Sequence, residues 1–253
     1  MITDTAPYSR LALYYDQVMN HVDYKKWAKF IKTILSHYYN KPKTIAELAC
    51  GTGAIFDYLK SNNWTLFGGD KCQSMLLVGK EKRANHLSHF FCADFRDIPL
   101  KKEYFDVALI LYDSANYLME DEDVTRMFGE VHQILKKDGL FIFDVVTPYI
   151  CNTAFRDYTE QEFWGKSGYA RKSWYHKEKS IQYNEFEIHV DGQIFKELHQ
   201  QKIRFMEEWI QFIESSPLKF MAAYHNFSLR KARNKSERIH FVCRKIKSND
   251  RIL

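Results

Sequence analysis

The chain has 253 residues and a formal net charge of +5, from 37 lysines and arginines against 32 acidic residues. At this length a chain buries roughly 70–75% of its extended surface, so we expect one domain, or one domain with an insertion. The N-terminal segment lacks the basic-then-apolar pattern of a signal peptide, and no run approaches the roughly 20 apolar residues of a membrane span. These features predict a cytoplasmic protein with no membrane partner.

The cysteines and histidines show no spacing typical of a metal site. Five cysteines are spread along the chain, several of them in apolar segments, and the ten histidines form no ligand motif. Reduced thiols in the cytoplasm fit this pattern best. We therefore predict that the protein holds no metal.

Aromatic side chains crowd the N-terminal segment. Among them are Tyr8, Tyr14, Tyr15 and Trp27. Two interpretations remain open. The rings pack an N-terminal helix, or they lie against a cationic ligand, since a cation over a ring face gains about 0.5–2 kcal/mol.

A short apolar run, Thr44–Glu47, is followed by small residues up to Ala54 and then by a helical pattern. The order of strand, glycine loop and helix is typical of α/β proteins that bind a nucleoside-bearing cofactor. No Gly-Lys-Ser/Thr sequence follows Gly53, which disfavours a phosphate-binding P-loop. Phe56 stands where the dinucleotide fingerprint needs its third glycine, which disfavours a pyrophosphate site.

The same loop, Glu47-Leu48-Ala49-Cys50-Gly51-Thr52-Gly53, resembles the first motif of class I S-adenosylmethionine (SAM) dependent methyltransferases. The family often has glycine at the positions of Ala49 and Ala54, and both replacements are small. The resemblance implies that SAM is the cofactor. It also implies that Glu47, Ala49, Gly51 and Gly53 border it.

A second strand is predicted over residues 64–70, ending in a carboxylate. Asp70 lies near the offset of roughly 20 residues at which an acid reaches ribose hydroxyls. Residues 70–76 resemble the family's Asp-x-Ser-x-x-Met-Leu signature, with Ser74 displaced by one or two positions. The resemblance implies that Asp70 binds the ribose and that Lys71 and Met75 lie beside the cofactor.

A third strand is predicted over residues 87–95. In the family, the acid at this point binds the adenine amino group and the next residue lines the adenine pocket. The resemblance therefore places Asp94 and Phe95 there. The alternatives are a capping or turn role for Asp94 and a core position for Phe95.

The apolar run 105–111 predicts a strand buried on both faces, leading into Tyr112 and Asp113. A helix over 122–135 is expected to close at Lys136–Gly139, before a fifth strand at 140–146. Alternation of helices and strands predicts a parallel, doubly wound sheet. The family resemblance implies a Rossmann-like sheet of seven strands in the order 3-2-1-4-5-7-6.

After Asp144 the pattern changes to alternating, aromatic-rich strands at 170–174, 181–190 and 193–203, with Asp191-Gly192 as a hairpin turn. We expect residues 150–205 to form a small antiparallel β lid, or substrate subdomain. Residues 1–149 and 206–253 would form the SAM-binding core with an N-terminal helical cover. A helix at 207–214 and strands at 220–227 and 238–244 would complete this core.

The segment Tyr8–Asp16 resembles the Tyr-x-x-x-Ala-x-x-Tyr-Asp sequence that precedes the core in a small-molecule subgroup, similar to sugar N-methyltransferases. There the segment folds over the cofactor. The resemblance implies that Tyr8, Tyr15, Trp27 and Tyr112 are cofactor neighbours.

Methyl transfer from SAM needs mainly alignment of the nucleophile and exclusion of water, so no catalytic triad is expected. Candidates for catalytic groups are Tyr112, Asp113, Tyr183, His199 and His225, and for each of the last three a buried core position is the favoured alternative. The chain lacks the Pro-Pro motif of base-amino methyltransferases and the Pro-Cys dipeptide of cytosine-C5 enzymes. We therefore expect direct, in-line transfer to nitrogen or oxygen of a small molecule, with S-adenosylhomocysteine as product.

Two other functions stay open. The basic run Arg230–Lys235 suits a solvated loop between strands, but it also suits a tRNA- or RNA-modifying methyltransferase. A SAM-binding protein that transfers no methyl group is the second alternative. The protein is expected to be a monomer or a homodimer.

Overall fold

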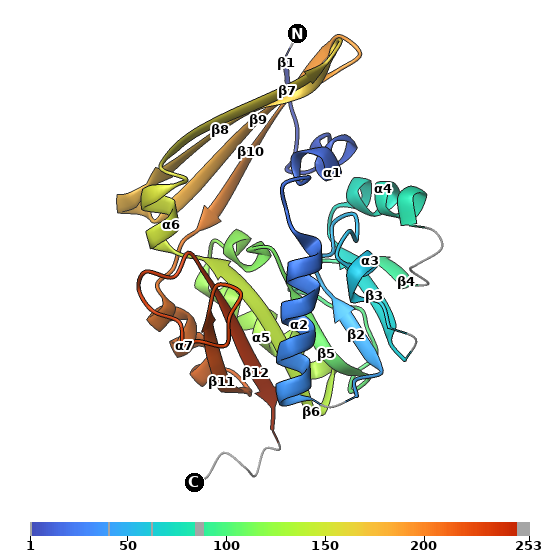
Figure 1. Ribbon diagram of the computed structural model, residues 1–253, viewed down its shortest axis with the longest axis vertical. Helices are drawn as coiled ribbons and strands as arrows, with labels where there is room; N and C mark the ends of the chain where they lie inside the picture. Colours follow the sequence, from blue (N-terminus) through green and yellow to red (C-terminus); the bar gives the residue numbers. More distant parts are fainter. Residues whose placement is uncertain (1, 40, 62, 84–88, 247–253) are drawn as a thin grey trace.

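A seven-stranded sheet forms the centre of the computed structural model, which describes residues 2–39, 41–61, 63–83 and 89–246 (Figure 1). Its strands lie in the order β4, β3, β2, β5, β6, β12, β11, and β12 alone runs antiparallel to both neighbours. The strands are β2 (Thr44–Glu47), β3 (Thr65–Asp70), β4 (His89–Cys92), β5 (Phe105–Ile110), β6 (Leu135–Val146), β11 (Leu218–His225) and β12 (Arg238–Lys245). In core-strand numbering this is 3-2-1-4-5-7-6, so the predicted order is confirmed.

Helices cover both faces of this sheet because successive strand residues point to opposite sides. Ile45, Val107 and Leu109 pack toward the longest helix, α2 (Tyr24–Tyr38). The residues next to them pack toward α5 (Asp121–Ile134) and α7 (Met206–Ser215). The remaining helices are α1 (Tyr15–Val18), α3 (Phe56–Leu59), α4 (Gln73–Arg83) and α6 (Pro148–Thr153), with short 3₁₀ helices at Leu11–Leu13, Ser114–Tyr117 and Lys177–Lys179.

Amphipathic patterning explains the two long helices. Six apolar residues of α2 are buried, and its first turn is capped by Asp23, whose carboxylate accepts from the backbone N–H of Lys26 at 2.8 Å. Helix α5 opens with three acidic residues, which suit the positive end of the helix dipole. No helix in the described part of the chain is long and apolar enough to span a membrane.

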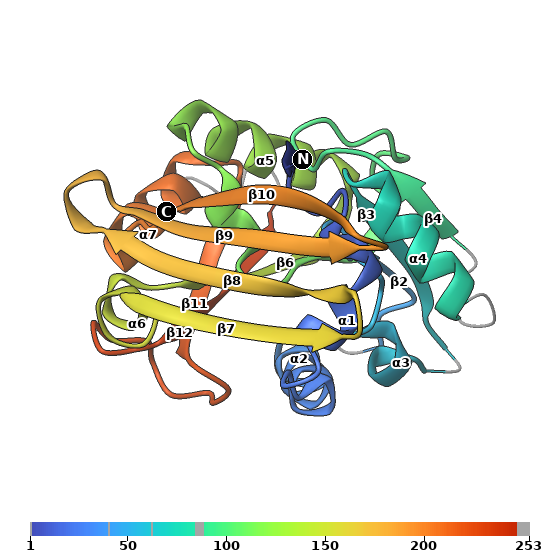
Figure 2. The ribbon, with the colours of Figure 1, turned by 90° about the horizontal axis from the view of Figure 1, so that it is seen from above.

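A second sheet lies across one end of the core (Figures 1 and 2). It contains the antiparallel strands β7 (Asp157–Trp164), β8 (Ser167–His176), β9 (Ile181–Val190) and β10 (Gln193–Lys202). We call residues 150–205 the lid. Asp191 and Gly192 form the tight turn between β9 and β10, both with positive φ (49° and 82°), which is the geometry that the Asp-Gly pair favours.

The first residues of the chain extend this second sheet. Strand β1 (Ile2–Asp4) pairs in parallel with β10, so that Ile2 lies opposite Ile194. The chain then crosses from the lid to the core as an extended segment and two short helices. We call residues 5–16 the N-terminal strap.

The structure differs from the sequence prediction at four places. Lys136–Gly139 do not close a helix but lie in β6, where Asp138, not Gly139, takes the left-handed conformation (φ 62°). Gly139 is needed instead for close packing, because a Cβ there would lie 2.9 Å from the carbonyl oxygen of Lys136. The predicted third strand is shorter, and its first two residues, Leu87 and Ser88, lie outside the described residues. Strand β7 and strand β1 were not predicted.

Asp106, at the start of β5, connects the segment that leads into β2 with the first residues of β6. Its carboxylate accepts hydrogen bonds from Tyr39, from the backbone N–H groups of Lys43 and Thr44, and from Lys136, at 2.8–2.9 Å. Burial opposes ionisation, but these donors hold the pKa of Asp106 at about 2. The ionised form is therefore favoured by folding.

Replacing Asp106 with Asn should lower the free energy of unfolding at pH 7 by about 2 kcal/mol, since each unit of pKa shift is worth about 1.4 kcal/mol. A carboxylate with a depressed pKa stabilises the fold above its unfolded pKa of about 4. That contribution disappears as the pH falls from about 4 toward 2. Urea unfolding across this range measures it, with Asp138→Asn as an exposed control. A difference between variant and wild type that does not change with pH would contradict the assignment.

Candidate active site

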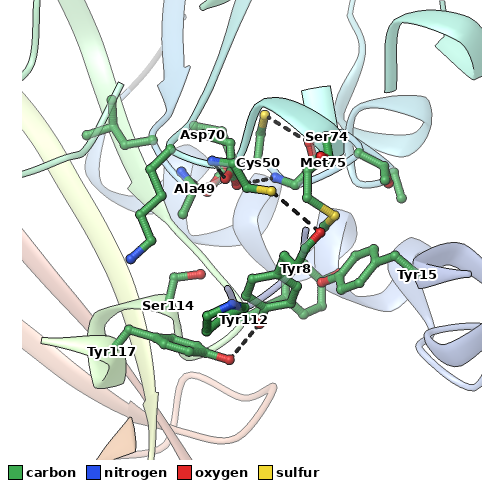
Figure 3. Close-up of a pocket in the computed structure, with 18 of the residues that line it drawn as sticks. Tyr8, Tyr15, Ala49, Cys50, Asp70, Ser74, Met75, Tyr112, Ser114 and Tyr117 are labelled. Carbon is green, nitrogen blue, oxygen red and sulfur yellow. Dashed lines mark hydrogen bonds between the residues drawn. The ribbon is translucent and has the colours of Figure 1, made fainter. Parts of the chain in front are cut away.

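A cavity of about 500 Å³ opens at the carboxyl ends of β2 and β3 (Figure 3). Ligands of α/β proteins bind at this edge of the sheet, because the loops that follow the strands gather there. The cavity is bounded by the glycine loop after β2, by the turn after β3 and by the strap. We call it the first cavity.

The glycine loop is held by the strand beside it. Asp70, at the end of β3, accepts from the backbone N–H of Gly51 through Oδ2 and from that of Cys72 through Oδ1, both at 2.8 Å. Gly51 has φ +56°, and a Cβ there would lie 3.0 Å from Cε of Met75. Glycine therefore lets the backbone face the cavity directly. Two carboxylate oxygens, each with acceptor capacity left, face the same space.

Glu47 brings a second carboxyl group to this cavity. It is 1% exposed, and Oε1 accepts from the backbone N–H groups of Ala49 and Leu111 at 3.3 Å. Its Oε2 has no hydrogen-bond partner among the described residues. Burial raises the pKa of Glu47 to about 8, against the lowering effect of the two backbone donors. A buried, unpartnered acceptor of this kind suits a ligand with a cationic N–H group.

A larger cavity of about 910 Å³ lies between the core and the lid. We call it the second cavity. Its lid side presents Arg171, Gln182, Asn184, His199 and Gln201, which project from β8, β9 and β10. The first and second cavities share four lining residues, and all four are tyrosines: Tyr8, Tyr15, Tyr112 and Tyr117.

Two of the shared tyrosines have strained backbones. Tyr8 has φ 66°, and Tyr112 has φ 59°, followed by Asp113 at φ 52°. Such left-handed conformations are uncommon for bulky residues and persist where the surroundings impose them. Asp144 imposes the second, because its carboxylate accepts from the N–H groups of Tyr112 and Asp113 at 2.8 and 3.0 Å. The ring of Tyr112 then lies 4.2 Å from that of Trp27.

Two charged groups on the core side of the second cavity, Arg238 and Asp113, are paired with each other. Arg238, on β12, forms ion pairs with Asp113 at 2.7 Å and with Asp144. Gln201 of the lid donates to Asp113 at 2.6 Å, which links the lid to the turn after β5. Burial raises the pKa of Asp144 to about 6, although Arg238 opposes this rise.

Residues 46–143 match a family described as a methyltransferase domain. YqeM of Bacillus subtilis, named as a methyltransferase, is 27% identical over 246 residues, which cover 95% of this chain and 98% of YqeM. A protein of Geobacillus sp. strain WCH70 with the same kind of name is 31% identical over 153 residues, and this match spans 59% of the chain and 62% of that relative. Residues 46–143 therefore form a methyltransferase domain.

Solved structures share the fold. A SAM-dependent methyltransferase from Clostridium acetobutylicum superposes with a TM-score of 0.78 at 23% identity, covering 93% of this chain and 97% of that one. The sugar N-methyltransferase KedS8 from Streptoalloteichus superposes with a TM-score of 0.75 at 15% identity, covering 93% and 92%. Both likenesses confirm the Rossmann-like methyltransferase sheet.

Most of the site residues predicted from the sequence line the two cavities of this methyltransferase. In the first cavity these are Tyr8, Tyr15, Glu47, Ala49, Gly51, Asp70, Lys71, Met75, Phe95 and Tyr112. In the second they are Trp27, Asp113 and His199, together with Tyr8, Tyr15 and Tyr112.

Four predicted residues lie outside both cavities. Gly53 is buried within the loop (φ 76°), and Asp94 forms a two-pronged pair with Arg96. Tyr183 stacks on Trp174 at 5.1 Å, and His225 accepts from or donates to Ser236 at 2.9 Å, beside a separate cavity. The functional roles of these four residues stay predictions, and their positions outside the cavities favour structural roles.

Sequence reasoning missed Tyr117, Glu197 and Arg171. Tyr117 follows the fourth core strand in a segment whose 3₁₀ helix has no clear sequence signal. Glu197 could have been found. In the alternating strand β10 it shares a face with Phe195 and His199, and a carboxylate on the buried face of a strand is unusual.

Replacing Glu47 with Gln should stabilise the protein at pH 8 relative to wild type. A carboxyl group with a raised pKa favours the fold only while it is protonated, so its contribution falls as the pH rises from about 4.3, its unfolded value, through about 8. The variant should therefore gain melting temperature relative to wild type as the pH rises from 5 to 8. Thermal unfolding measures this, with the exposed Glu122→Gln as control. An unchanged difference would show that Glu47 is ionised in the folded state.

Proposed function

We propose that this enzyme transfers a methyl group from SAM to a nitrogen or oxygen atom of a small-molecule acceptor. The observation that carries the proposal is the meeting of the two cavities at Tyr8, Tyr15, Tyr112 and Tyr117. SAM in the first cavity and an acceptor in the second would then face each other across these rings. Substrate and cofactor in such an arrangement are held for direct, in-line displacement.

The residues of the first cavity fit SAM. Gly51 gives backbone access, Asp70 offers acceptor oxygens for the ribose hydroxyls, and the unpartnered Oε2 of Glu47 suits the ammonium group of the methionine part. Phe95 provides an aromatic wall for adenine. Bound SAM supplies an activated methyl group on a sulfonium, a cation that the neighbouring tyrosine rings favour.

The second cavity suits an acceptor of moderate size with several polar groups. A volume of about 910 Å³ is in the range of pockets for drug-sized ligands. Arg171 is engaged by Glu160 and Asn184, so its charge is already compensated. Oε1 of Gln182, which is 1% exposed, has no partner among the described residues. Neutral amides and aromatic rings together favour a polyhydroxylated or amino-substituted ring, such as an amino sugar.

The lid and the strap exclude water from the methyl group. We assign acceptor binding to residues 150–205 and SAM binding to the core with its N-terminal cover. Asp16 anchors the strap to the core through Thr52 at 2.6 Å and Arg83 at 3.2 Å. The five free cysteines suit a reducing compartment, which supports the cytoplasm as the site of action.

Calorimetry with SAM tests the proposal. Wild type should bind, and Asp70→Ala should weaken binding about 100-fold or more, because hydrogen bonds to a charged group are worth about 1.5–3 kcal/mol each. The exposed Asp138→Ala should bind like wild type. Absence of binding by wild type, or undiminished binding by the Asp70 variant, would remove the proposal. Wild type that binds SAM but yields no S-adenosylhomocysteine with any acceptor would instead support a binding protein without methyl transfer.

The RNA alternative has its own test. Residues 230–235 lie in the loop between β11 and β12, and most of them are exposed. Reversing the charges of Arg230 and Arg233 to Glu should leave SAM affinity unchanged, since neither residue lines the first cavity. Gel-shift titration with tRNA should show no binding that is both tight and salt-sensitive. Such binding, lost in the double variant, would favour RNA as the acceptor.

A further inference from the structure

A line of buried hydrogen bonds runs from the meeting point of the cavities into the lid. The hydroxyl of Tyr8 lies 2.7 Å from that of Tyr117, which lies 2.9 Å from Nδ1 of His199. Nε2 of His199 lies 3.2 Å from Oε2 of Glu197. Glu197 and His199 are 0% and 1% exposed. Both project from β10 into the interior, whereas Tyr8 and Tyr117 line both cavities.

The partners of Glu197 fix it as an acceptor. Its two oxygens accept from the backbone N–H groups of Tyr8 at 2.7 Å, Arg10 at 2.6 Å and Leu11 at 3.0 Å. Burial alone would raise the pKa of Glu197, but the bonds from His199 and from this backbone turn lower it below its ordinary value. Glu197 is therefore a carboxylate with no proton to donate.

Because Glu197 is ionised, it determines which group donates and which accepts in every hydrogen bond from Glu197 to Tyr8. His199 must carry its proton on Nε2, which leaves Nδ1 as an acceptor. Tyr117 then donates to Nδ1 of His199, and Tyr8 donates to the oxygen of Tyr117. The remaining lone pairs of the Tyr8 oxygen are left to accept a hydrogen bond from a group in the cavities.

We propose that Tyr8, Tyr117, His199 and Glu197 form a proton relay that removes the proton of the acceptor's nucleophile during methyl transfer. The proposal rests on the function proposed above and narrows its acceptor to an amine or a hydroxyl, since a carboxylate has no proton to give. Tyr8 is the catalytic residue that touches the acceptor. Tyr117, His199 and Glu197 act through it.

The step balances in atoms and charge. The nucleophile forms its bond to the methyl carbon while the methyl–sulfur bond breaks and leaves its electron pair on sulfur. The proton of the nucleophile passes to the oxygen of Tyr8, the proton of Tyr8 to Tyr117, and that of Tyr117 to Nδ1 of His199. One positive charge is lost at the sulfonium and one appears on the imidazolium, beside the carboxylate of Glu197.

The surroundings of His199 keep it neutral before the reaction. Burial lowers the pKa of His199, and Glu197 opposes this shift. Two cations contribute in the same direction as burial, Arg171 from β8 and Lys71 from the turn after β3. The other titratable groups that face the ring are the hydroxyls of Tyr8 and Tyr117, which do not ionise near neutral pH because burial raises their pKa. A neutral imidazole is the form that can take up a proton.

Nuclear magnetic resonance of the full chain tests the direction of the line. In ¹⁵N-histidine-labelled protein saturated with S-adenosylhomocysteine, His199 should be the neutral Nε2–H tautomer between about pH 6 and 8. The His199→Gln variant identifies its signal. The opposite tautomer, or a protonated ring in this range, would overturn the relay while leaving the proposed function intact. Failure to bind S-adenosylhomocysteine would count against the proposed function itself.

Variants then test the relay in turnover, measured as S-adenosylhomocysteine formed with amines, phenols and carboxylates small enough for the second cavity. Tyr117→Phe and His199→Gln should lower kcat about 100-fold or more, with KM for SAM and melting temperature unchanged. A matched control is His189→Gln on β9, because His189 pairs with Glu187 at 2.8 Å in the same spacing but on the partly exposed side. It should keep full activity.

A purely structural role would not move the pH profile. Glu197→Gln removes the partner of the imidazolium, so the acidic limb of the profile should shift to lower pH by about one unit as kcat falls. The Glu197→Gln substitution could also disturb the strap, whose backbone N–H groups bind Glu197. Tyr117→Phe controls for this effect, because it interrupts the hydrogen-bonded relay and leaves the bonds of Glu197 intact. Three results would each overturn the proposal. They are a Tyr117→Phe variant with unchanged kcat, a folded Glu197→Gln variant whose acidic limb of the pH profile does not shift, and activity with carboxylate acceptors alone.

Discussion

Buried carboxylates at the ends of the core strands hold the loops that form this site. A parallel sheet gathers its loops at one edge, where their backbone N–H groups have no strand partners. Asp70 at the end of β3 takes the N–H of Gly51 after β2, and Glu47 at the end of β2 takes that of Leu111 after β5. Asp144 in β6 takes the two N–H groups of the turn after β5. Each of these three strands, β2, β3 and β6, thus fixes the loop that follows a neighbouring strand.

Hydrogen bonds from backbone N–H groups to buried carboxylates also stabilise the strained backbone conformations at Tyr112 and Tyr8, two of the residues at the meeting point of the cavities. A left-handed conformation at Tyr112 costs about 1–3 kcal/mol, which the bonds from Asp144 to two successive N–H groups offset. In the strap, Glu197 does the same for Tyr8 and the residues after it.

The strands of the core could be predicted from local sequence patterns, but the contacts between the core and the lid could not. Buried strands such as β5 show as continuous apolar runs, and the Asp-Gly pair places the β9–β10 turn without any tertiary information. Strand β7 lies at the sheet edge with almost every residue exposed, so it lacks the alternation that marks a half-buried strand. The Tyr8–Tyr117 contact joins residues 109 positions apart, and no local rule anticipates it.

Strand β1 has a consequence for how the molecule is assembled. Its residues pair with strand partners about 190 positions later, as Ile2 does with Ile194. Contacts so distant in sequence carry a large loop-closure cost and form slowly. During synthesis the core strands β2 to β6 and the glycine loop emerge before β10, whereas β11 and β12 follow it. The cover over the first cavity therefore cannot take its final place until β10, which ends at Lys202, has been made.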